Sequence, residues 1–138
     1  MFSRLWICFS VVALLQVGCG NPSVKEMSQE IPSLSYPALE DFDQTAMMEV
    51  GYAYGGGNVN GLKAAVKKDS FKSAVEQFEA APLPEDAASK QPQKDAVVAA
   101  ANDLIEKAGG SDNEATKAAY DNLLKAITDL RVGQPAQE

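Results

Sequence analysis

Along residues 37–132, apolar side chains recur at spacings of three or four, which is the period of an α-helix with one buried face. The first such stretch spans residues 37–54, and its apolar positions are Leu39, Phe42, Ala46, Val50 and Ala53. Three glycines and an asparagine at residues 55–58 follow it, and glycine is a strong helix breaker. The pattern therefore predicts a first helix over residues 37–54.

The helical pattern continues through residues 61–80, but it slips by one residue at the polar run Lys67–Ser70. Such a slip predicts either a bend in one helix or two short helices that meet there. The following segment, residues 81–93, is rich in proline, alanine and polar side chains, as loops commonly are. The second stretch is therefore expected to end near Ala80.

Two further amphipathic stretches complete the pattern. One spans residues 94–108 and stops at Gly109–Gly110, because glycine commonly terminates helices. The other begins at Ser111, whose spacing from Glu114 matches a capping box. Its apolar positions then recur every three or four residues as far as Leu130, so a long helix is predicted.

No segment alternates apolar and polar residues in the manner of an exposed strand. Helices that each carry one apolar stripe bury those stripes against one another. The sequence therefore predicts an all-α fold, a small bundle of three to four helices, over residues 37–132. The apolar stripes are rich in alanine, whose small side chain buries little area, so modest stability is expected.

The N-terminal segment differs in composition from the rest of the chain. Arg4 is the single charge in residues 1–18, and residues 5–15 are almost continuously apolar. A charged start followed by a short apolar run is typical of a signal peptide. The run is shorter than the roughly 20 apolar residues that cross a bilayer as a helix. Residues 1–18 are therefore predicted to be a targeting segment.

The end of this segment reads Leu-Leu-Gln-Val-Gly-Cys and resembles the lipobox of bacterial lipoproteins, in which small residues precede a cysteine. Gly18 and Cys19 match the family's residues on either side of the cleaved bond, whereas Gln16 departs from the usual leucine. The resemblance implies cleavage between Gly18 and Cys19. It also implies a diacylglyceryl lipid on the Cys19 thiol, with acyl chains such as palmitate. Gly20 is not the aspartate that retains many members at the inner membrane.

Residues 19–36 are predicted to be the lipidated cysteine and a flexible tether, because they are polar, contain prolines and show no sustained period. Residues 133–138 are expected to be a disordered tail. The expected location is the cell envelope, with a membrane as partner through the N-terminal lipid, and the outer membrane is favoured in a cell with two. Two alternatives stay open: a secretory signal cut near Gly18 or Gly20, and an uncleaved N-terminal anchor.

Composition excludes several kinds of chemistry. The formal net charge is −7, and an acidic chain without basic clusters binds phosphate backbones poorly, so no nucleic-acid partner is expected. There is no histidine, the commonest general base and metal ligand. Both cysteines, Cys8 and Cys19, lie in the N-terminal segment, away from the helical stretches. No catalytic residue, metal ligand or cofactor is therefore assigned, and the chain is not expected to be an enzyme.

Residues 51–58 combine two tyrosines with four glycines, the most unusual local composition in the chain. Tyr52 and Tyr54 are the candidate interaction residues, because tyrosine is enriched at protein interfaces. The alternative interpretation is a helix end followed by a linker, with one tyrosine packed on the core. Met47 and Met48, just before this run, are interpreted as core-filling side chains, since the chain lacks the other ligands of a haem site.

Residues 69–81 resemble the second helix of a tetratricopeptide repeat, and the matching positions are Phe71, Ala74, Val75, Phe78 and Ala81. The family's first-helix pattern is not found upstream, and no second copy occurs at a period of about 34 residues. A genuine repeat would imply a helical module that binds peptides.

The expected function is that of a lipid-anchored envelope lipoprotein whose helical domain binds another envelope protein or has a structural role. Two alternatives stay open: a tetratricopeptide-like module that binds peptides, and a carrier of a small ligand in a pocket between helices. The interaction protein should expose a contiguous apolar or aromatic patch. The carrier should enclose an apolar cavity of about 300 Å³ or more.

Overall fold

The structure is a computed structural model that describes residues 35–132 of the chain. The signal peptide expected at residues 1–18, the lipidated Cys19, nearly all of the expected tether and the tail at residues 133–138 lie outside this range. The expectations for those segments stay predictions.

The described residues are all-α, as the hydrophobic pattern predicts, and they contain no strand. In chain order the elements are α1 (Pro37–Phe42), the π-helix η1 (Asp43–Met47), α2 (Met48–Tyr54), the 3₁₀ turn η2 (Gly55–Gly57), α3 (Val59–Val66), α4 (Asp69–Ala80), the 3₁₀ helix η3 (Glu85–Lys90), α5 (Gln91–Gly109) and α6 (Asn113–Arg131). Because α1, η1 and α2 follow one another without a break, this range holds five helices and not three to four.

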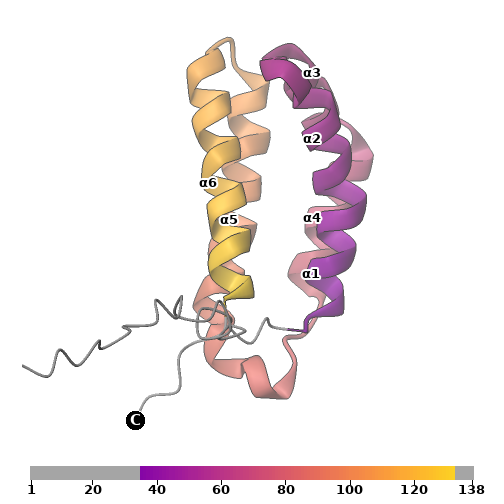
Figure 1. Ribbon diagram of the computed structural model, residues 1–138, viewed down its shortest axis with the longest axis vertical. Coiled ribbons are helices and arrows are strands. Elements are labelled where there is room, and N and C mark those ends of the chain that lie inside the picture. The colour runs from indigo at the N-terminus through magenta and orange to yellow at the C-terminus, as the bar shows by residue number, and fades with distance from the viewer. Residues whose placement is uncertain (1–34, 133–138) are drawn as a thin grey trace, which may run out of the picture.

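The helices stand side by side along one axis (Figure 1). The continuous helix α1–η1–α2 rises beside α6, and α3 followed by α4 returns toward the other end of the bundle. The long helices α5 and α6 form a hairpin with the most extensive contact in the molecule. We call the end with the start of α1 and the end of α6 the proximal end. The opposite end, with the α2–α3 and α5–α6 turns, is the distal end.

The additional helix arises at Lys67–Lys68, where the sequence left a bend or a break open. Lys68 has an extended backbone, with φ −65° and ψ 145°, so two short helices meet there. The preceding apolar stripe ends at Val66, and an unbroken helix would turn Phe71 away from it, because five residues rotate the chain by about 500°. The break returns Phe71 to the core, and both side chains are buried.

The core holds an aromatic cluster that contains one residue expected in the tether. Tyr36 is only 2% exposed, and its ring centroid lies 5.7 Å from that of Phe78. Phe78 also stacks on Phe42, with centroids 5.2 Å apart. The Tyr36 hydroxyl donates to the carbonyl oxygen of Ala81 at 3.1 Å. The folded domain therefore begins at Tyr36, one residue earlier than the predicted boundary at residue 37.

Two lysines are buried at the proximal end: Lys90, in the segment that the sequence predicts as a loop, and Lys94, at the start of the next predicted helix. Residues 85–90 form η3, and α5 begins at Gln91, three residues before the expected start. Lys90 and Lys94 are each only 6% exposed. Both ammonium groups donate to backbone carbonyl groups at the ends of other helices. A cation at a helix C-terminus is favourable because the helix dipole is negative there.

The distal end depends on glycine and on local caps. Gly56 and Gly57 have φ of 69° and 81°, a left-handed conformation that side chains disfavour. Asn58 then caps α3, since its side-chain oxygen accepts from the Gly61 backbone N–H at 3.0 Å. A Cβ atom on Gly61 would lie only 2.2 Å from the Ala53 carbonyl oxygen, so only glycine lets α3 approach α2 this closely.

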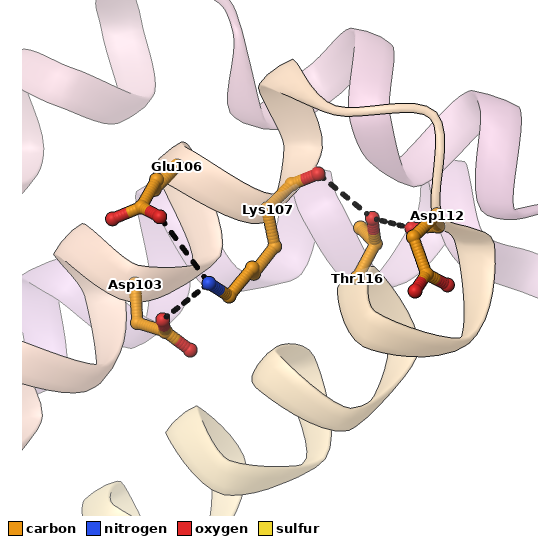
Figure 2. A network of polar contacts seen from close by, with 5 residues as sticks. All are labelled: Asp103, Glu106, Lys107, Asp112 and Thr116. Carbon is orange, nitrogen blue, oxygen red and sulfur yellow. Dashed lines mark hydrogen bonds and ion pairs between the residues drawn. The ribbon is translucent and has the colours of Figure 1, made fainter.

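The α5–α6 hairpin closes on a network of polar contacts (Figure 2). The buried Thr116 hydroxyl lies 3.1 Å from the Lys107 carbonyl oxygen and 2.8 Å from that of Asp112. The Asp112 carboxylate accepts from the Ala115 backbone N–H at 3.0 Å, so Asp112 is the N-cap of α6. The predicted capping box at Ser111 is therefore wrong by one residue. An aspartate is an equally good cap, and it leaves Ser111 in the turn.

Candidate interaction surface

The structure separates the two candidate tyrosines. Tyr52 is 80% exposed and projects from the last turn of α2, near the distal end. Tyr54 is half-buried, and its ring packs edge-on against Tyr120 of α6, with centroids 5.1 Å apart. Tyr52 is therefore available to a partner, whereas Tyr54 holds α2 against α6.

Two contacts at different heights show that α1–α2 and α6 run antiparallel. Near the proximal end, Arg131 donates to the Asp43 carboxylate at 2.6 Å. Near the distal end, a Cβ atom on Gly51 would lie 3.5 Å from the Tyr120 hydroxyl. Burial raises the pKa of Tyr120 above its usual value of 10.0, and Asp121, Tyr54 and Asp43 raise it further. The line of contact between α2 and α6, which we call the seam, is thus packed where Tyr120 meets α2.

Two large apolar side chains lie beside this seam. Met48 is 51% exposed on α2, and Leu124 is 40% exposed on α6. Met48 is three residues before Gly51, and Leu124 is four residues after Tyr120, so the two stand about level on antiparallel helices. Tyr52 lies one turn beyond Met48 on the same helix face. We call Met48, Tyr52 and Leu124, with the α6 face beside them, the α2–α6 surface.

Only part of this surface is predictable from the sequence. Met47 is buried, as predicted, but the prediction that Met48 fills the core is wrong. The helical period contains the signal, because Met48 lies two residues from the core position Val50, about 200° away around the helix. Leu124 was missed because it sits beside the buried Leu123 in a clear apolar stripe.

Charges around the α2–α6 surface are paired with each other. On α6, Lys117 bonds to Asp121 at 2.7 Å and Lys125 bonds to Asp129 at 2.6 Å. The hydrogen bond to Asp121 and its negative charge raise the pKa of Lys117. Nine carboxylates of the described range have no ion pair: Glu40, Asp41, Glu76, Glu79, Glu85 and Asp86 on α1, α4 and η3, Asp95 on α5, and Asp112 and Glu114 at the start of α6. The two ion pairs between Lys117 and Asp129 are therefore neutral as a group, and the unpaired Glu114 lies three residues before them.

Three hollows on the protein open to solvent, and Lys125 and Asp129 of α6 line one of them. One of about 240 Å³ lies between α1–η1 and α4, over Phe42 and Phe78. One of about 270 Å³ lies between α5 and α6, beside Gln93. The third, about 540 Å³, is lined largely by polar residues of α4 and α5. None of these three encloses a ligand in the way the carrier alternative requires.

The tetratricopeptide-like positions lie on α4 and serve the core of this bundle. Phe71, Val75 and Phe78 are buried, and Ala74 and Ala81 are half-buried. The preceding helix α3 has 8 residues against the 12 of α4, so the pair is unequal in length. The resemblance is accounted for by one amphipathic helix that packs against α1 and α5.

Within residues 35–132, histidine, cysteine and carboxylate side chains do not gather in a group that could hold a metal ion. Every helix of this range is too short or too polar to traverse a bilayer. No protein-family model, curated protein or solved structure matches the chain.

Proposed function

We propose that this chain is a lipid-anchored protein of the bacterial cell envelope that acts without catalysis, by binding another protein through the α2–α6 surface. The observation that carries the proposal is the 80% exposure of Tyr52, a large aromatic side chain on a helix whose other aromatic residue is packed. Exposed aromatic side chains are enriched at the centre of protein interfaces. Met48 and Leu124 extend the apolar area across the seam.

The position of the surface is compatible with an anchor at the N-terminus. The described chain begins at the proximal end, where Tyr36 is fixed in the core. Tyr52 lies sixteen residues farther along, about 24 Å at the rise of an α-helix. A protein held to a membrane by residues before Tyr36 would present Tyr52 away from the lipid. The surface would then be accessible to a partner in the aqueous space.

The test of the anchor is Cys19→Ala in the full chain, followed by fractionation of membranes. We expect the variant to move from the membrane pellet to the soluble fraction, because the thiol that accepts lipid is gone. The matched control is Cys8→Ala, which removes the other cysteine and should leave the protein in the pellet. Equal retention of Cys19→Ala and the control in the pellet would rule out lipidation at Cys19.

The test of the surface is a photo-crosslinking amino acid placed at position 52 of the full chain in intact cells. We expect a defined covalent adduct after illumination, whereas the same amino acid at the exposed position 73 on α4 should give none. Both positions are solvent-exposed in the structure, so the comparison separates a specific contact from random encounter. Equal yields at the two positions would contradict the proposal.

A further inference from the structure

The outer face of α6 carries charges that alternate in sign every four residues. Lys117, Asp121, Lys125 and Asp129 have the order plus, minus, plus, minus. Residues four apart stand above one another on a helix, so these side chains form one ridge. Within the ridge, each lysine bonds to the aspartate that follows it.

This order is complementary to itself in the opposite direction. The midpoint of the ridge is position 123, and reversing the ridge about that point exchanges every lysine with an aspartate. A second α6 laid antiparallel across the first would therefore place Lys117 opposite Asp129 of the second copy. It would likewise place Asp121 opposite Lys125. A two-fold symmetric contact requires this kind of self-complementarity.

The apolar residues of the surface lie close to the same midpoint. Leu124 is adjacent to position 123, and Met48 stands about level with it on the neighbouring helix α2. An antiparallel pair would thus meet near its centre through Leu124 and Met48. Asp121 and Lys125 lie within one turn of that centre, and Lys117 and Asp129 lie farther out along α6.

The distribution of charge also favours this face for self-association. The protein carries a net charge of −7, so two copies repel each other over most orientations. Of the nine carboxylates without an ion pair in the described range, six lie on α1, α4 and η3, whereas two, Asp112 and Glu114, lie at the start of α6. Contact through the α2–α6 surface brings together the parts of the two molecules whose charges are already balanced.

We infer that the partner of the α2–α6 surface is a second copy of this chain, bound antiparallel with its α6 across the first. This inference rests on the proposed function, because it names the occupant of the same surface. The bond pattern is Lys117 to Asp129 and Asp121 to Lys125, each made twice by the two-fold axis.

The size of the face predicts a weak dimer. The 19 residues of α6 span about 28 Å, and two adjacent helices are about 20 Å wide, which gives roughly 560 Å² for each copy. The total of about 1,100 Å² is at the lower limit of specific interfaces. Confinement of both copies to one membrane raises their effective concentration and favours the pair. The dimer should therefore be sought in the membrane and not in dilute solution.

The antiparallel arrangement is compatible with a shared membrane. It places the proximal ends of the two copies about 28 Å apart along the bundle axis. The expected tether, residues 20–35, has a maximal length of about 55 Å, at roughly 3.3–3.6 Å for each residue. Each copy therefore reaches the same bilayer.

The experiment uses the full chain in membranes with Leu124→Cys, which places a thiol near the proposed two-fold axis. After mild oxidation, we expect a disulfide-linked species of twice the chain mass on a non-reducing gel. Ser73→Cys on α4 is the matched control, because that residue is also exposed but lies outside the surface. We expect at least tenfold less dimer from the control.

Charge variants in the Leu124→Cys background test the pairing itself. Lys125→Asp would face Asp121 of the second copy, so the disulfide-linked dimer should fall at least tenfold. Lys72→Asp on α4 is the control, because it likewise breaks an ion pair within one helix. It should leave the yield of disulfide-linked dimer unchanged. Reversal of the whole ridge, with K117D, D121K, K125D and D129K together, restores complementarity and should restore the dimer. Circular dichroism of each variant checks that the helices still form.

Three outcomes are distinguishable. A dimer that Lys125→Asp abolishes and the fourfold reversal restores supports the inference. Equal yields from Leu124→Cys and Ser73→Cys, or a yield that Lys125→Asp leaves unchanged, overturn it. If the crosslinker at position 52 then captures a different envelope protein, the proposed function stands without the second copy. If it captures nothing, both are wrong.

Discussion

The two ends of the bundle are held together in different ways. At the proximal end, buried side chains reach across the fold: Lys90 donates to the Leu130 and Val132 carbonyl oxygens, and Lys94 donates to those of Glu79 and Ala81. At the distal end, the bonds are mostly exposed: Asp112 caps the Ala115 N–H three residues on, and the Lys63 ammonium group donates to the Gly110 carbonyl oxygen and the Asn113 side chain across the fold. The two ends therefore differ in burial: buried lysines secure the proximal end, whereas exposed bonds, local caps and close backbone packing secure the distal end.

This difference has a consequence for stability. A buried carbonyl group that loses its donor costs about 1–3 kcal/mol, because water cannot replace the lost bond. A local cap at an exposed helix end contributes about 1 kcal/mol. The distal end also contains Gly61, whose close approach to Ala53 leaves no room for a side chain. Substitutions at the two ends therefore separate backbone packing, buried hydrogen bonds and local capping.

The largest effect is expected from Gly61→Ala at the distal end. In an ordinary helix this change stabilises by up to about 1 kcal/mol. Here the new Cβ would lie 2.2 Å from the Ala53 carbonyl oxygen, so α3 must move away from α2. We expect the free energy of unfolding in urea to fall by about 3 kcal/mol. Gly109→Ala is the control, because a Cβ there meets nothing within 4 Å. A neutral Gly61→Ala would show that the α2–α3 packing is loose.

At the proximal end, Lys94→Met should have the next largest effect. Methionine keeps most of the apolar stem but loses the ammonium group that lies 2.7 Å from the Glu79 carbonyl oxygen. We expect the free energy of unfolding to fall by about 2 kcal/mol. The matched control is Lys72→Met on α4, where the lysine is exposed and its ion pair is weak. Equal stabilities of the two variants would mean that the buried ammonium group contributes nothing.

The contrast between the ends also explains what the sequence could predict. The all-α class and the helix that ends near Tyr54 follow from a period that any amphipathic helix must show. The buried roles of Lys90 and Lys94 could not be predicted, because their acceptors lie 13–42 residues away along the chain. The sequence predicts Tyr36 in the tether for the same reason, since its hydrogen-bond partner is 45 residues distant.

The candidate site was predictable only in part. Tyr52 and Tyr54 look equivalent in the sequence, and only the approach of Tyr120 from α6 distinguishes them. The alternation from Lys117 to Asp129 is visible in the sequence, but its meaning depends on α6 having an uncovered face. Which helix faces remain uncovered is a property of packing, and no local pattern contains it.

A smaller effect should follow from Asp112→Ala, which removes the side-chain cap of α6. We expect a loss of about 1 kcal/mol in the free energy of unfolding, because the Ala115 backbone N–H loses its acceptor. Ser111→Ala is the control, and it should change stability by less than about 0.5 kcal/mol. A larger loss of stability from Ser111→Ala than from Asp112→Ala would instead support the capping box that the sequence predicts at Ser111.

The smallest expected effect appears only at alkaline pH and concerns the seam between α2 and α6. Burial raises the pKa of Tyr120 above 10.0, so the folded protein holds this proton more tightly than the unfolded chain does. The protonated Tyr120 hydroxyl therefore adds to the free energy of unfolding. This contribution is fully present below about pH 10 and is lost as the pH rises through the pKa that Tyr120 has in the folded state. Tyr120→Phe cannot ionise, so its melting temperature should fall less between about pH 9 and about pH 11. Tyr52→Phe, at an exposed position, should behave like the unaltered protein over the same range. If the melting temperatures of Tyr120→Phe and the unaltered protein fall equally over this pH range, ionisation of Tyr120 does not oppose folding.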